Sequence, residues 1–135
     1  MELSVGMYVR AENGTIAKIT KHEHYWINNE EWNYICTDIG CLIDIELIIK
    51  ASHTLLGNDE EPCLIEEGDY VNGCLIVEIT QDPFIKGQIN LWTNMILSEG
   101  EPFPNEYYKA KILEKDIKSI VTKEQFESMS YKVED

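Results

Sequence analysis

The side chains that could bind a metal ion are three histidines and four cysteines. His22 and His24 lie two residues apart, which on a strand places both imidazoles on one face, and His53 could add a third ligand. No fourth ligand follows at a recognisable spacing. Cys36, Cys41, Cys63 and Cys74 do not form the C-x2-C pairs of structural zinc sites. We therefore expect no metal, no other cofactor, and reduced cysteines that pack as small apolar side chains.

Motifs for nucleophilic catalysis or phosphate binding are absent from the sequence. It contains no G-x-S-x-G, no Walker A loop, no G-x-G-x-x-G and no H-E-x-x-H. The many acidic residues could supply carboxylate pairs, but such pairs identify a catalytic acid and base only through their geometry. We expect a non-enzymatic protein.

The charge is strongly negative and concentrated in the middle of the chain. The formal net charge is −14, from 25 acidic and 11 basic residues, and between His22 and Ile85 the only basic residue is Lys50. Because such a surface repels phosphates, we expect no direct binding of duplex nucleic acid. A concentrated acidic face suits a basic groove on another protein. The alternative is that the charge only keeps the protein in solution.

Aromatic residues accompany part of this acidic segment. Tyr25-Trp26, Trp32 and Tyr34 flank Glu30-Glu31. Large rings beside carboxylates are typical of protein interfaces, although strands usually bury such rings in a core. The candidate partner-binding residues combine the two features and are Trp26, Glu30, Glu31, Trp32, Asp59, Glu60, Glu61, Glu66, Glu67 and Asp69.

The elements that must position these residues occur twice along the chain. Gly6–Val9, Asn13-Gly14 and Ile16–Thr20 are matched in order by Gly68–Val71, Asn72-Gly73 and Ile76–Thr80, and Asp44–Lys50 is matched by Asp116–Thr122. Ordered matches of this kind predict an internal duplication. We expect residues near 4–50 and 66–122 to form two similar β units.

Each unit has the sequence features of short strands. The Asn-Gly pairs predict tight hairpin turns, and Cys41–Leu47 alternates apolar and acidic residues, as a strand does. Near the end, Thr122 and Gln125 form a capping box that predicts a helix over Lys123–Met129. The predicted fold is all-β, with two tandem SH3-like small β-barrels and a short C-terminal helix.

The predicted domain boundaries follow from the repeats. Residues 1–56 form the first SH3-like repeat, 57–65 an acidic linker, and 66–135 the second repeat, with an inserted loop near 98–106 and the helix. No stretch approaches the apolar length of a membrane span, and the N-terminus lacks the features of a signal peptide, so we expect a cytoplasmic protein.

Three blocks of the sequence resemble those of a known group of proteins. Val5–Arg10, Ile65–Gly73 and Ile120–Glu127 are similar to stretches of small accessory proteins encoded by phages and prophages of Gram-positive bacteria. The resemblance implies a setting in the host cytoplasm, where countering a host defence is one plausible role. The preferred hypothesis is a phage-encoded inhibitor of a host defence effector that occupies its basic nucleic-acid-binding surface.

Two alternatives stay open at the level of sequence. In the first, the protein binds or sequesters a nucleotide signal, with aromatic rings stacking on the base and Lys109, Lys111 or Arg10 holding the phosphate. In the second, it is a structural interaction module. The oligomeric state is not predicted by any of these patterns.

Overall fold

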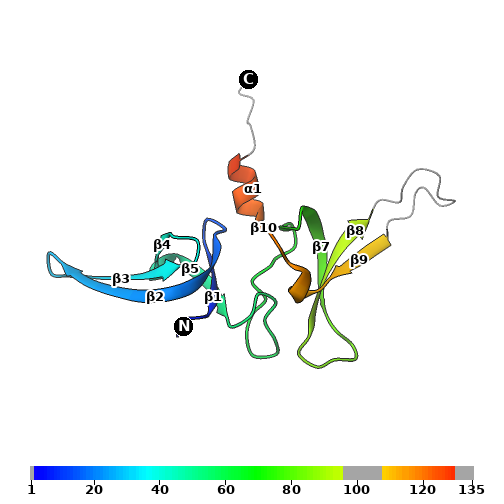
Figure 1. Ribbon diagram of the computed structural model, residues 1–135, viewed down its shortest axis with the longest axis horizontal. Coiled ribbons are helices and arrows are strands. Elements are labelled where there is room, and N and C mark those ends of the chain that lie inside the picture. The colour runs from blue at the N-terminus through cyan, green and yellow to red at the C-terminus, as the bar shows by residue number, and fades with distance from the viewer. Residues whose placement is uncertain (1, 96–107, 130–135) are drawn as a thin grey trace, which may run out of the picture. The chain divides into compact units, whose positions relative to one another are not determined.

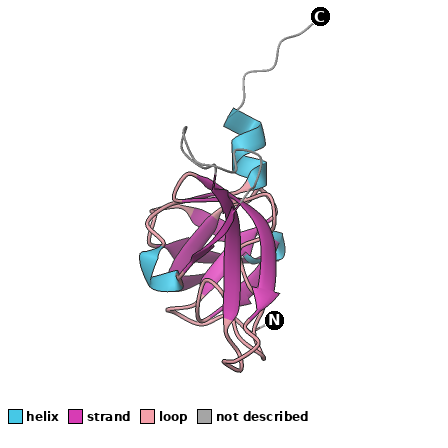
Figure 2. Ribbon diagram, turned by 90° about the vertical axis from the view of Figure 1, so that its right-hand side faces the viewer, coloured by secondary structure: helices cyan, strands magenta, loops and turns pink. Residues whose placement is uncertain are grey.

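The computed structural model describes residues 2–95 and 108–129, and it is mostly β. The chain divides into two compact units, Met1–Leu64 (unit 1) and Ile65–Asp135 (unit 2), and each is described by itself. Each unit contains one antiparallel five-stranded sheet. Figures 1 and 2 show that strands make up most of the described chain. The predicted β class and the predicted short helix are confirmed. No helix in the described part of the chain has the length and apolar character needed to cross a membrane.

Unit 1 is built from five strands and one short 3-10 helix. They are β1 (Tyr8–Ala11), β2 (Ile16–Ile27), β3 (Glu30–Thr37), β4 (Leu42–Asp44), the 3-10 helix η1 (Ile45–Leu47) and β5 (Ile48–Ser52). The strand order in the sheet is β4-β3-β2-β1-β5. Its core is a cluster of buried apolar side chains, which are Met7, Val9, Ala11, Ile19, Ile35, Ile43, Ile48 and Ala51.

The β2–β3 hairpin extends past this core. In the first part of β2, Ala17 and Ile19 are buried and alternate with exposed Lys18 and Thr20, which is the pattern of a strand covering a core on one face. Beyond Thr20 the strand has no buried residue. The hairpin therefore projects from the rest of its sheet, as Figure 1 shows at the end of β2 and β3.

Unit 2 repeats the topology of unit 1. Its elements are β6 (Tyr70–Val71), β7 (Cys74–Gln81), β8 (Ile89–Met95), β9 (Tyr108–Ile112), the 3-10 helix η2 (Glu114–Asp116), β10 (Ile120–Val121) and the helix α1 (Lys123–Met129). The strand order is β10-β6-β7-β8-β9, which is the order of unit 1 with β6 in the place of β1. In each unit the 3-10 helix lies between the fourth and fifth strands. No pairing of outer strands closes either sheet among the described residues.

The strand register corrects the predicted alignment of the two repeats. Ile19 donates its backbone N–H to Met7 O, and Ile76 donates the equivalent bond to Asp69 O, so Ile19 corresponds to Ile76 and not to Ile79. The shift arises because the β1–β2 connection is longer than the Asn72-Gly73 turn between β6 and β7.

The second sequence match was displaced in the same way. Asp44 is the N-cap of η1, and the residue in that position before η2 is Leu113. The match of Asp44 with Asp116 was therefore wrong. The repetition is visible in the strand order and not in the residue-by-residue alignment of the two halves.

The local predictions met different outcomes. Asn72 and Gly73 both have positive φ, 53° and 78°, as a tight hairpin turn requires, whereas of Asn13 and Gly14 only the glycine does, at 88°. The single strand predicted over Cys41–Leu47 is wrong after Asp44, because the Asp44 carboxylate accepts a hydrogen bond from Glu46 N (2.9 Å) and starts η1.

The predicted capping box is confirmed. Gln125 N donates to Thr122 Oγ1 (3.3 Å), and Thr122 N donates to Gln125 Oε1 (3.1 Å), so two free N–H groups at the start of α1 are satisfied reciprocally. The loop predicted near residues 98–106 lies outside the described residues.

Candidate functional site

The projecting end of the β2–β3 hairpin exposes three large apolar side chains. Tyr25, Trp26 and Ile27 are 46%, 68% and 53% exposed. The turn that joins the strands is formed by Asn28 and Asn29, both with positive φ (52° and 65°), which is the geometry of a tight hairpin turn. Contiguous exposed apolar residues are a common feature of interaction surfaces.

The two faces of the hairpin differ. Tyr25 and Ile27 lie opposite Trp32 and Glu30 on β3, so these four share one face, while Trp26 lies opposite Glu31 on the other. Trp32 stacks on Tyr34 with ring centroids 6.1 Å apart and planes 6° from parallel. Trp26 is exposed, whereas Trp32 is partly buried. Its indole is therefore held in place as a fixed platform.

A short chain of polar contacts orders the face of the hairpin that carries Tyr25 and Trp32. Lys21 Nζ lies 2.7 Å from Glu23 Oε1, and Tyr25 OH donates to Glu23 Oε2 at 3.0 Å. The hydrogen bond from Lys21, followed by that from Tyr25, lowers the pKa of Glu23. Glu23 is thus ionised at neutral pH and orients the Tyr25 ring.

The histidines of β2 lie on the opposite face. His24 Nε2 is 2.8 Å from Glu31 Oε1, and the His24 and Trp26 rings are 5.9 Å apart. His53 is in contact with Glu61. Nowhere among residues 2–95 and 108–129 do three His, Cys, Asp or Glu side chains form a group that could hold a metal ion.

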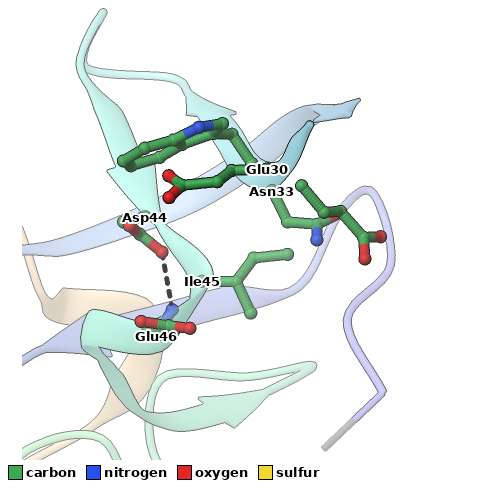
Figure 3. Close-up of a pocket in the computed structure, with 7 residues that line it drawn as sticks. Glu30, Asn33, Asp44, Ile45 and Glu46 are labelled. Atoms are coloured by element: carbon green, nitrogen blue, oxygen red, sulfur yellow. Dashed lines mark hydrogen bonds between the residues drawn. The ribbon is translucent and has the colours of Figure 1, made fainter. Parts of the chain in front are cut away.

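A pocket of about 590 Å³ lies beside the Trp32 platform. Its lining comes from β3 and from the turn into η1, and consists of Glu30, Glu31, Trp32, Asn33, Asp44, Ile45 and Glu46. Every ionisable residue in this lining is acidic. In Figure 3 the carboxylates of Glu30, Asp44 and Glu46 lie one above another along one side of the pocket. An indole surrounded by carboxylates is suited to an organic cation.

The predicted acidic residues 59–61 lie elsewhere in unit 1, on an ordered turn. Asn58 Oδ1 accepts hydrogen bonds from Glu60 N (2.8 Å) and Glu61 N (3.0 Å). Glu61 Oε2 accepts from His53 N (3.1 Å) and lies 2.8 Å from His53 Nδ1. Asp59 and Glu60 are exposed, whereas Glu61 is engaged within the fold.

The remaining predicted acids belong to unit 2 and have structural contacts. Glu66 Oε1 lies 2.8 Å from Lys123 Nζ, and this hydrogen bond raises the pKa of Lys123. Asp69 is fully buried and accepts hydrogen bonds from Glu66 N (2.7 Å) and Lys123 N (2.9 Å). Glu67 is exposed. Asp69 therefore anchors the start of α1 and is not accessible to a partner.

Unit 2 exposes an apolar tip on the hairpin equivalent to β2–β3. Phe84, in the β7–β8 connection, is 93% exposed. Asp82 fixes this loop by accepting hydrogen bonds from Phe84 N (2.8 Å), Ile85 N (2.9 Å) and the Asn90 amide (3.2 Å). These bonds, those from Phe84 N and Ile85 N first, lower the pKa of Asp82.

Sequence reasoning missed the part of the pocket that lies at the end of β4 and in η1. Asp44 ends the strand, but Ile45 and Glu46 were assigned to the same strand and belong to η1, although an Asp two residues before its N–H partner is a signal for a turn or cap. Arg10, proposed as a phosphate ligand, is fully buried and donates to Leu64 O (2.9 Å). Lys111 is exposed on β9, and the Lys109 side chain lies outside the described part of the chain.

The cysteines are free thiols. Cys36, Cys41 and Cys63 are partly buried, but Cys74 is exposed in β7, so the expectation of packed side chains is wrong for that residue.

No protein-family model matches the chain, and no curated protein or solved structure matches it significantly.

Proposed function

We propose that this is a non-enzymatic acidic binding protein that occupies a basic groove of a host protein, in the manner of a phage-encoded inhibitor of a host defence effector. The observation that carries the proposal is the β2–β3 hairpin of unit 1, which combines exposed aromatic and apolar side chains with an acidic pocket at Trp32. Aromatic anchors beside carboxylates complement a surface rich in arginine and lysine.

The type of surface follows from the charge of the hairpin. A groove that binds nucleic acid presents Arg and Lys to phosphates, and carboxylates can contact the same side chains. The pocket lining supplies four carboxylates and no basic residue. The setting in a phage or prophage rests on the resemblance of Val5–Arg10, Ile65–Gly73 and Ile120–Glu127 to accessory proteins of that origin.

We also propose that each unit is an SH3-like small barrel. The support is that both units have five antiparallel strands in the same order, with a short helix before the fifth. A cytoplasmic location is part of the same proposal, because the partner of such an inhibitor would be a host effector in the cytoplasm.

The nucleotide-binding alternative has less support. Its phosphate would need a basic ligand. Arg10 is enclosed in unit 1, and Lys111, which is exposed on β9, does not line the pocket beside Trp32, which is acidic and repels phosphate. A purely structural interaction module would also use the hairpin, but it would not displace nucleic acid from its partner.

The test has two steps. First, the tagged protein captures partners from a Gram-positive host lysate at low and moderate salt, and the partner is purified. Second, fluorescence anisotropy measures whether the protein displaces a labelled duplex from that partner. We expect displacement that weakens with salt, and no binding of the duplex by the protein itself.

A matched pair of variants locates the surface. Trp26→Ser changes an exposed tip residue and should weaken partner binding at least about tenfold, as expected for an aromatic anchor. Asp59→Asn/Glu60→Gln removes two exposed charges elsewhere in unit 1 and should mainly slow association. A captured partner that keeps its nucleic acid in the presence of excess protein would contradict the proposed inhibition.

A further inference from the structure

The geometry points to a specific ligand class for the pocket beside Trp32: we infer that it receives the guanidinium group of an arginine side chain presented by the partner. The inference rests on the proposed function and adds to it the chemical group that is recognised and the residues that recognise it.

The first support is a rigid aromatic platform. Trp32 is partly buried and stacks almost parallel on Tyr34, with planes 6° apart. Its Nε1 is buried and has no hydrogen-bond partner in the described structure, so the contacts that orient the indole are packing contacts such as the stack on Tyr34. A fixed indole with an open side is the preferred aromatic partner of a cation.

The second support is negative charge that no basic side chain in the lining balances. Glu31 contacts His24, and one oxygen of Asp44 accepts from Glu46 N. Among the described residues, Glu30 and Glu46 have no ion-pair partner. Carboxylates gathered in a pocket repel one another, and an entering cation relieves that repulsion.

The third support is the apolar surface next to the pocket. Tyr25 lies directly opposite Trp32, and Ile27 lies opposite Glu30, so both share the face of the platform. They are 46% and 53% exposed. A segment that places its arginine over Trp32 would bury these side chains with its neighbouring residues. The hairpin thus offers an apolar contact and a charged one together.

Arginine fits this combination better than other cations. Its guanidinium is planar and weakly hydrated, stacks on aromatic faces, and binds carboxylates through two parallel hydrogen bonds. A lysine ammonium is strongly hydrated and lacks the planar match. A metal ion would need a compact ligand group, and the described residues provide none. A pocket of about 590 Å³ also has room for a side chain and part of its backbone.

The experiment uses the full chain and three labelled peptides of equal length, in which the variable residue is arginine, lysine or citrulline. Citrulline has nearly the shape of arginine but no charge. Anisotropy should show the arginine peptide binding at least about tenfold more tightly than the lysine peptide, with no binding of the citrulline peptide. In NMR spectra, the Trp32 indole N–H signal should shift with the arginine peptide.

Two variants with the same change in charge provide the control. Glu30→Gln/Glu46→Gln should weaken the arginine peptide at least about tenfold. Glu2→Gln/Glu12→Gln, which changes two exposed carboxylates of the same unit outside the pocket lining, should weaken it less than about twofold. Thermal unfolding verifies that both variants fold. Equal losses in the two variants, equal affinity for arginine and lysine, or no peptide binding would each overturn the inference.

Failure of this inference and failure of the proposed function give different results. If Glu30→Gln/Glu46→Gln still displaces nucleic acid from the partner as the unchanged protein does, the arginine pocket is refuted and the proposed function survives. If the arginine peptide binds the pocket but the partner keeps its nucleic acid, the pocket stands and the inhibitor proposal falls.

Discussion

Replacing Asp69 with alanine should destabilise unit 2 strongly. The buried carboxylate accepts hydrogen bonds from Glu66 N at 2.7 Å and Lys123 N at 2.9 Å, and so joins the turn before β6 to the first residue of α1. The charge also lies at the N-terminal end of the helix, where a negative group is favourable. Alanine would leave both N–H groups without these partners.

The magnitude follows from those two bonds. A hydrogen bond to a charged group contributes about 1.5–3 kcal/mol, so their loss should cost about 3–5 kcal/mol after partial relaxation. A unit of this size has a free energy of unfolding of roughly 3–10 kcal/mol. Asp69→Ala should therefore leave unit 2 marginal or unfolded, and Asp69→Asn, which keeps one acceptor oxygen, should fall between alanine and the natural residue.

The assay must report on unit 2 alone. Trp92 is the tryptophan of this unit, and its indole N–H donates to Thr80 Oγ1 at 2.8 Å. In a background with Trp26→Phe/Trp32→Phe, its fluorescence follows urea unfolding of unit 2. The midpoint should fall by at least about 1 M for Asp69→Ala.

The control is the exposed neighbour Glu67. Glu67→Ala should change the free energy of unfolding by no more than about 0.5 kcal/mol, as is usual for an exposed surface residue. If Asp69→Ala unfolds at the same urea concentration as Glu67→Ala, the structural role assigned to Asp69 is refuted, and the residue returns to the list of possible partner contacts.

Three further predictions concern turns and pH. Gly57→Ala should lower the thermal midpoint of unit 1 much more than Gly40→Ala does. Both glycines have positive φ, but only at Gly57 would the new Cβ collide with the backbone of its own loop. Equal midpoints for the two variants would contradict this. Asn72→Gly keeps the turn but removes side-chain hydrogen bonds to the segment before β10, and should cost about 1–3 kcal/mol in urea unfolding, whereas Asn28→Gly should be nearly neutral. The pKa of Asp82 is lowered in the folded protein. The stabilisation of the loop by its ionised carboxylate is therefore fully present above the usual pKa of 3.8 and is lost as the pH falls through the lower pKa of the folded state. Amide NMR signals of that loop should report this transition, and Asp82→Asn should abolish it.

The sequence predicted the features that depend on neighbouring residues. The capping box of Thr122 and Gln125 and the turn at Asn72-Gly73 are set by residues within one turn of each other, and both have the expected geometry. The turn at Asn28-Asn29 could have been found by the same rule, because asparagine tolerates positive φ.

Features that join distant segments could not be predicted in this way. Asp69 resembled the exposed acids around it, and its burial depends on Lys123, far away in the sequence. The pocket needed the pairing of β4 with β3, which places Asp44 opposite Tyr34, and the turn into η1, which brings Glu46 into the same lining. The repeat alignment slipped because β-branched runs such as Ile16–Thr20 match several positions equally well, while the register is decided by loop length.

The order of the strands also determines when each unit can finish folding on the ribosome. In each unit the first strand along the chain pairs with the last. The sheet of unit 1 is therefore complete once Ser52, the partner of Tyr8, has left the exit tunnel, and the unit itself once Leu64, which accepts a hydrogen bond from Arg10, has followed. Unit 2 must wait longer, because Val71 pairs with Ile120 and Asp69 requires Lys123. The hairpin with Trp26 and the acidic pocket would therefore be assembled while the second unit is still being translated. A nascent chain stalled after unit 1 would already present the proposed binding surface.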